Sequence, residues 1–338
     1  DALLMGLRDG SWPVRDAACL GSASFYRHFP RASAPKEEAL WQLWSAHLAD
    51  VIWSVREDAA LACVTVLQVR NVGNDEGIPE AADAAEWLQR LLSTCQSALE
   101  AITQQEDEMS RYGPANGDTH WGAAHKLARD NDPALHESQQ LYSCGSLAPQ
   151  MKPGSATDDF GLEQEQEHGH DHDHQPWQLT DGAVYLWREL TLIAPERALP
   201  LAVAGFALLE PRPFGSYFIV QETVLTQLCL ILPRLAQVNL QQPLLELLDW
   251  PSVVGNVALA WQQTLHRPVQ KAAQDCWAVL QRFDERAWKQ AMTPALEEAV
   301  AQNKFLRDHT AEAAAAEIQG IGKDGREGNG NLFANWSV

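Results

Sequence analysis

Two stretches of sequence decide the fold: SWPVRDAAC at Ser11–Cys19 and IWSVREDAA at Ile52–Ala60. At an offset of 41 residues they share a Trp, a Val, an Arg and an Ala, and Asp9 aligns with Asp50. A weaker third copy, HRPVQKAAQDC, lies at His266–Cys276. A repeat of this period, with small and apolar residues at helical spacing, is typical of stacked helix pairs. The sequence therefore predicts an all-α fold, a superhelical solenoid of antiparallel helix pairs.

Each conserved position of the copies has a physical explanation. An Asp before the second helix can cap it, and Pro13 suits the first helical turn because no amide donor is needed there. The Val and Ala side chains are expected to face inward, where small residues let neighbouring helices approach closely. The predicted buried anchors of the repeats are Trp12, Val14, Trp53, Val55 and Val269.

The combination of spaced leucines, an Asp turn, Trp/Pro-Val-Arg and a small-residue helix resembles the HEAT/armadillo family. The resemblance is clearest in residues 1–64 and weaker in 180–310. It implies an Asp–Arg ladder between adjacent repeats. It also implies a non-enzymatic scaffold without a cofactor, which presents a helical surface to a protein partner in a larger assembly.

Composition divides the chain into four segments. Residues 1–105 read as N-terminal repeats that continue upstream, and 178–318 as C-terminal repeats. Between them, 106–177 form an acidic, His-rich, low-complexity insert with 14 acidic and four basic residues. We expect 151–175 to be disordered, because this stretch has no apolar periodicity. Residues 319–338 are Gly-rich and predict a flexible tail.

The insert contains the one clear cluster of metal-binding side chains. The tract EQEQEHGHDHDH alternates histidines with aspartates, at His168, His170, His172 and His174. Imidazole and carboxylate at this density favour weak binding of Zn²⁺, Ni²⁺ or Cu²⁺. A solvated acidic spacer explains the same composition, since a catalytic or structural site needs fixed geometry and a second layer of supporting contacts.

Net charge restricts the partners. With 25 Lys and Arg against 45 Asp and Glu, the chain carries −20 and is a poor match for nucleic acid or anionic lipid. We expect a protein partner with a basic surface, and no membrane insertion, because the longest apolar run is too short to span a bilayer. Six widely spaced cysteines without a CxxC pair predict reduced thiols and an intracellular location. We expect the cytoplasm, with a cytoskeletal or organellar location as the alternatives.

Polar positions of the second helices are the candidates for contacting this partner. They are Arg15, Asp16, Arg56, Glu57, Gln270 and Lys271. The two arginines have a competing interpretation, because the ladder implied by the family resemblance would occupy them within the fold.

Two other classes of function are known for HEAT-like folds. Tubulin-binding TOG arrays are HEAT-like and use a Trp at a turn within the repeat, where Trp12 and Trp53 also lie, but no lysine lies at either turn. Deoxyhypusine hydroxylase is a HEAT-like enzyme with repeated His-Glu pairs around iron; this chain has one such pair, His136-Glu137, in the insert. A metal-binding protein or an enzyme remains an alternative through the His-rich tract alone.

Overall fold

The computed structural model describes residues 1–72, 81–104, 175–212, 217–262, 266–294 and 296–298. These residues form helices and connecting turns, with no strand among them, so the predicted all-α class is confirmed. Most of the insert, including the four histidines of the tract, and the tail at 319–338 lie outside the described residues. The chain divides into two compact units, Asp1–Ala291 and Met292–Val338. The architecture below is that of the first unit.

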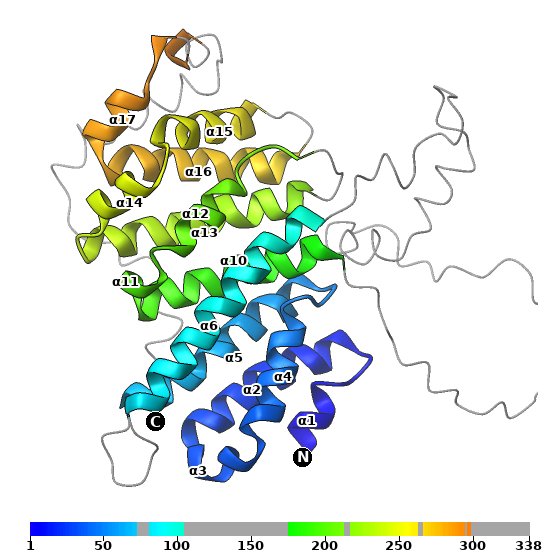
Figure 1. Cartoon of the computed structure of the whole chain (residues 1–338). Coiled ribbons are helices and arrows are strands. Elements are labelled where there is room, and N and C mark those ends of the chain that lie inside the picture. The colour runs from blue at the N-terminus through cyan, green and yellow to red at the C-terminus, as the bar shows by residue number, and fades with distance from the viewer. Residues whose placement is uncertain (73–80, 105–174, 213–216, 263–265, 295, 299–338) are drawn as a thin grey trace, which may run out of the picture. The chain divides into compact units, whose positions relative to one another are not determined.

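Five long helices of this unit pack one against the next in the order of the chain (Figure 1). They are α2 (Trp12–His28), α5 (Trp53–Val72), α10 (Pro176–Ile193), α13 (Tyr217–Gln237) and α16 (Arg267–Phe283). Other helices pack against this series: α1 (Ala2–Gly6) on α2, α4 (Glu37–His47) on α5, α6 (Ala81–Glu100) on α5 and α10, α12 (Leu201–Ala207) on α6 and α10, and α15 (Trp250–Gln262) on α16. Short helices connect them: α3 (Pro30–Ser33), α11 (Pro195–Ala198), α14 (Gln241–Leu247), α17 (Glu285–Ala291) and the 3₁₀ turns at Ala34–Lys36 and Ala101–Gln104.

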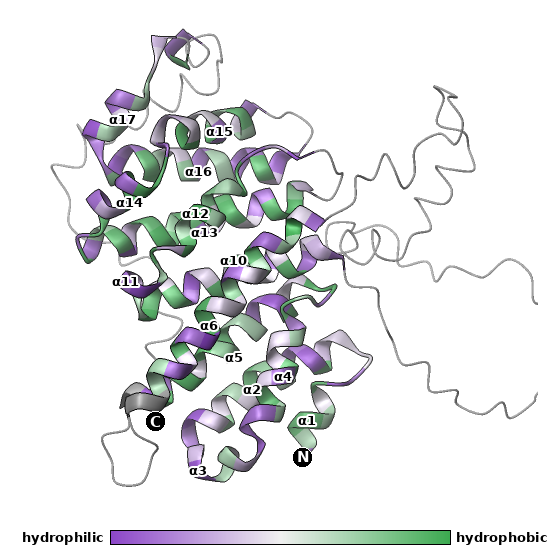
Figure 2. Ribbon diagram, in the orientation of Figure 1, coloured by the Kyte–Doolittle hydropathy of each residue, from purple (hydrophilic) through white to green (hydrophobic). Residues whose placement is uncertain are grey.

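Helix α13 is the most apolar of the long helices (Figure 2). It has the length and composition to cross a bilayer, but most of its apolar residues are buried between α10 and α16. This is the environment of a core helix.

Tryptophan fills much of the core. Of the 11 tryptophans in the described residues nine are buried, at positions 41, 44, 87, 177, 187, 250, 261, 277 and 288. Several meet edge to face, such as Trp277 with Trp288 at 4.5 Å between ring centroids, an arrangement that aromatic rings favour.

The first two repeat copies have the same local structure. Trp12 is the first residue of α2 and Trp53 the first of α5. In the first copy, Arg15 Nη1 donates to the carbonyl oxygens of residues 9 and 10, at 3.0 and 3.1 Å. In the second, Arg56 Nη1 donates to the equivalent oxygens of residues 50 and 51, at 2.7 and 3.1 Å. The same sequence motif therefore forms the same hydrogen-bonded turn in both copies.

Burial of the anchors differs from the prediction. Val55 and Val269 are fully buried, but Val14 is 41% exposed: α5 lies between two long helices, α2 and α10, whereas besides α5 the main neighbours of α2 are the short helices α1 and α3. Trp12 and Trp53 are 42% and 40% exposed. The prediction that these two tryptophans fill the core between repeats is therefore wrong: as first residues of their helices, they project at the turns.

The helices on either side of the insert form a pair in space. Helix α6 lies before the insert and α10 after it, and the two pack together. The second helix begins at Pro176, so the predicted insert boundary at 177 is slightly too late, and Trp177 is buried.

Candidate functional site

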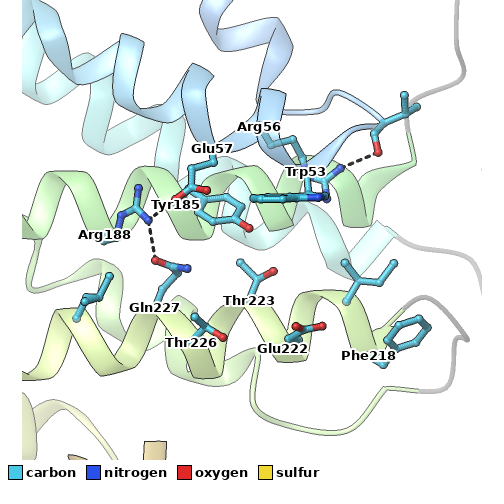
Figure 3. A pocket seen from close by; sticks show the side chains of 13 residues that line it. Trp53, Arg56, Glu57, Tyr185, Arg188, Phe218, Glu222, Thr223, Thr226 and Gln227 are labelled. Carbon is cyan, nitrogen blue, oxygen red and sulfur yellow. Dashed lines mark hydrogen bonds and ion pairs between the residues drawn. The ribbon is translucent and has the colours of Figure 1, made fainter. Parts of the chain in front are cut away.

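A groove of about 430 Å³ opens between the N-terminal end of α5 and helices α10 and α13 (Figure 3). Helix α5 and the turn before it contribute Val51, Trp53, Arg56 and Glu57; α10 contributes Tyr185 and Arg188; α13 contributes Phe218, Ile219, Glu222, Thr223, Thr226, Gln227 and Leu230. The volume is within the range of ligand and peptide sites. The groove is the candidate functional site of the described part of the chain.

Arg56 lies at one end of the groove floor, and each of its three guanidinium nitrogens has a partner. Its Nε and Nη2 both lie 2.8 Å from Asp181 Oδ2, on α10, while Nη1 donates to two backbone carbonyls of the turn before α5. Side-chain exposures of 1% for Arg56 and 0% for Asp181 make this a fully buried ion pair.

Arg188 is equally committed at the other end of the groove. Its Nη1 donates to Glu57 Oε1 at 2.8 Å and to Gln227 Oε1 at 2.9 Å, and its Nε and Nη2 bind Glu189 Oε1. Helices α5, α10 and α13 are therefore joined through one guanidinium. Each guanidinium nitrogen of the two arginines is thus already paired within the fold.

Carboxylates outnumber the guanidiniums around the groove. Arg56 and Arg188 face Asp181, Glu57, Glu189 and Glu222, which leaves a formal charge of −2. Burial, followed by the nearby charge of Asp181, raises the pKa of the Glu222 carboxyl. A positive charge placed beside Glu222 would favour the ionised carboxylate and so lower this pKa again.

Aromatic and apolar groups form the rim. Trp53 is 40% exposed and lies across the groove from α13 (Figure 3). Phe218 stacks on the ring of His266 at 4.2 Å, and burial lowers the pKa of that histidine. Leu230, at the other end of the α13 face, is half exposed. The groove therefore combines an acidic floor with an exposed indole.

The predicted partner-contacting residues do not form one surface. Arg15 binds Asp50 through two hydrogen bonds of 2.8 and 3.0 Å, and Arg56 is buried, so both arginines act between helices within the fold. Glu57 lines the groove. The remaining candidates lie elsewhere: Asp16 beside Asp58, Gln270 with its amide donating to the Trp261 carbonyl, and Lys271 exposed on α16.

Sequence reasoning missed the residues that α10 and α13 bring to the groove, chiefly Tyr185, Arg188 and Glu222. One signal was available: an Arg and a Glu interrupt two strongly apolar helices, and charges in such helices are seldom without a partner or a role.

The described residues hold no group of three or more His, Cys, Asp or Glu placed for a metal ion. Four of their five cysteines are buried as free thiols, and Cys229 is half-buried.

Comparison with known proteins finds no family model, no curated protein and no solved structure that matches the chain. What the groove binds is therefore inferred from its own side chains.

Proposed function

We propose that this chain is a HEAT/armadillo-like solenoid and works as a non-enzymatic scaffold inside the cell, binding a protein partner with a basic surface. The serial packing of α2, α5, α10, α13 and α16 supports the solenoid. The matching arginine contacts of the two repeat copies support the family resemblance.

The observation that carries the binding proposal is the state of the two groove arginines. Because Asp181, Glu57, Glu189, Gln227 and backbone carbonyls already pair with every nitrogen of the two guanidiniums, the groove is a poor site for a phosphate or carboxylate. Its excess charge is negative, and the net charge of −20 attracts basic surfaces over long range. Association with such a partner would slow as salt rises, while dissociation changes less.

A photo-crosslinking amino acid at Thr226 tests the proposal directly, because this residue is exposed and lines the groove. The matched control carries the same group at Val203, which is exposed on α12 and does not line the groove. In cells that make the protein, we expect the Thr226 position to crosslink to a basic segment, identified by mass spectrometry. Equal yields at both positions, or crosslinks at Thr226 to acidic segments, would contradict the proposal.

One observation favours a tubulin-binding adaptor as a second candidate. Trp12 and Trp53 are exposed at turns, as the TOG resemblance requires. The charge around them does not fit, because Asp9, Asp50 and Glu57 lie where a site for acidic tubulin would need basic residues. Co-sedimentation with microtubules separates the two candidates: binding abolished by Trp12→Ala and Trp53→Ala together would favour the tubulin adaptor.

A further inference from the structure

We infer that the groove receives an arginine side chain of a protein partner, held between the Trp53 ring and the Glu222 carboxylate. The inference rests on the proposed function that a basic protein binds here, and it adds the chemical group that is recognised and the two residues that recognise it.

Glu222 supplies the first half of the argument. Its carboxyl group is half-buried on α13, and it makes no ion pair or hydrogen bond in the described part of the chain. The two positive groups of the groove face it from α5 and α10, but Arg56 is paired with Asp181 and Arg188 with Glu57 and Glu189. A half-buried carboxylate with no cation of its own is costly unless a ligand supplies one.

Trp53 supplies the second half. Its indole lies across the groove from the α13 side chains, as Figure 3 shows, and 40% of the residue remains exposed. Indole is the aromatic ring that binds cations best, and arginine is the cation most often found on it. Large exposed aromatic residues next to a concave polar site are also typical of binding hot spots.

The geometry favours a guanidinium over an ammonium. A planar guanidinium can stack on the indole and still donate two parallel hydrogen bonds to a carboxylate, whereas a lysine ammonium is a strongly hydrated point charge. The side chains of Thr223, Thr226 and Gln227 line the same wall and provide polar contacts for the backbone on either side of the arginine. A volume of about 430 Å³ also leaves room for residues next to the arginine.

The chain contains matched controls for both residues. Trp12 is the repeat equivalent of Trp53, is also the first residue of its helix, and is 42% exposed, but it does not line the groove. Glu246 is an exposed glutamate on α14, so Glu246→Gln changes the net charge by the same amount as Glu222→Gln.

The test measures binding of two fluorescent peptides to the full chain by anisotropy: Ala-Arg-Ala-Arg-Ala and the same peptide with lysines. We expect Trp53→Ala and Glu222→Gln each to weaken the arginine peptide about five- to tenfold, and Trp12→Ala and Glu246→Gln to leave it unchanged. The lysine peptide is expected to bind more weakly and to respond less to Trp53→Ala. Circular dichroism confirms that each variant is folded.

A second measurement does not depend on any substitution at Trp53. In ¹⁵N-labelled protein, the Trp53 indole resonance should move on addition of the arginine peptide, and the Trp12 resonance should not. Equal losses for each variant and its control, or no shift at Trp53, would overturn the inference. The two claims can fail separately. If the peptide test fails but Thr226 still crosslinks to basic partners, the proposed function stands and the arginine site is wrong. If the peptide binds specifically but no partner crosslinks at Thr226, the groove recognises arginine and the proposed function is wrong.

Discussion

The buried ion pair between Arg56 and Asp181 gives the sharpest prediction about stability. Arg56 joins α5 to α10 and also ties down the turn before α5, through carbonyl oxygens at 2.7 and 3.1 Å. Asp181→Asn removes the charge that compensates a guanidinium only 1% exposed. Loss of one partner of a buried pair costs about 3–5 kcal/mol in the free energy of unfolding, because the remaining charge stays desolvated.

Replacing both partners has a smaller effect than the sum of the single changes. The variant Arg56→Met with Asp181→Leu removes both charges of this pair, although two backbone carbonyls lose their donor, at about 1–3 kcal/mol. From the cycle of Arg56→Met, Asp181→Leu and the double variant, we therefore expect a coupling energy of about 3 kcal/mol, at the upper end for residues in contact.

The assay is urea unfolding followed by circular dichroism and by tryptophan fluorescence, with coincident transitions required for a two-state analysis. The control is Glu38→Gln, which breaks the exposed pair between Glu38 and Arg90; their side chains are 57% and 38% exposed. That change should cost less than about 1 kcal/mol. If Asp181→Asn costs no more than Glu38→Gln, or if the cycle is additive, the inference that this pair holds α5 to α10 is wrong.

Three further predictions use single residues of the core. Gly182→Ala should destabilise the protein strongly or prevent folding, because the added Cβ would lie 1.9 Å from the carbonyl oxygen of Leu48, just after α4. The control is Gly255→Ala, whose added Cβ meets nothing within 4 Å. In the same urea assay this control should stabilise α15 by about 0.5–1 kcal/mol. Trp44→Ala, at a fully buried residue, should cost about 3–5 kcal/mol in unfolding free energy. Burial, followed by Asp16 and a further carboxylate, raises the pKa of Asp58 to about 7 from 3.8, so the folded state holds a proton that the unfolded state releases. The contribution of Asp58 to stability therefore falls between about pH 4 and pH 7, and Asp58→Asn should raise the melting temperature at pH 8 but not at pH 4; equal changes at both values would refute this.

The repeat was predictable from the sequence because its causes are local. The turn before each second helix is built by an aspartate, a tryptophan and an arginine within seven residues, and the same letters gave the same hydrogen bonds at Arg15 and Arg56. Apolar periodicity and proline punctuation also act within each helix, so helices after the insert can be recognised from the sequence. The exception is α17, Glu285–Ala291, which is too short for its periodicity to be read.

The burial of equivalent repeat positions depends on which helices pack around them, and the repeat pattern does not show this. Val14 and Val55 occupy the same place in their helices, and one is 41% exposed while the other is fully buried. The reason is that α5 lies between the long helices α2 and α10, whereas besides α5 the main neighbours of α2 are the short helices α1 and α3. Periodicity identifies the apolar face of a helix, but it carries no information about which helix lies against that face.

The groove shows the same division between local and long-range causes. The sequence alone determined that Trp53 begins a helix and that Glu57 lies one turn after it. Only the tertiary structure brought Arg188 and Glu222 to the same place, from helices on the far side of the insert. Arg188 and Glu222 are far from Trp53 and Glu57 along the chain, and no local sequence pattern spans that separation. The acidic character of the groove therefore appears only once the helices are packed.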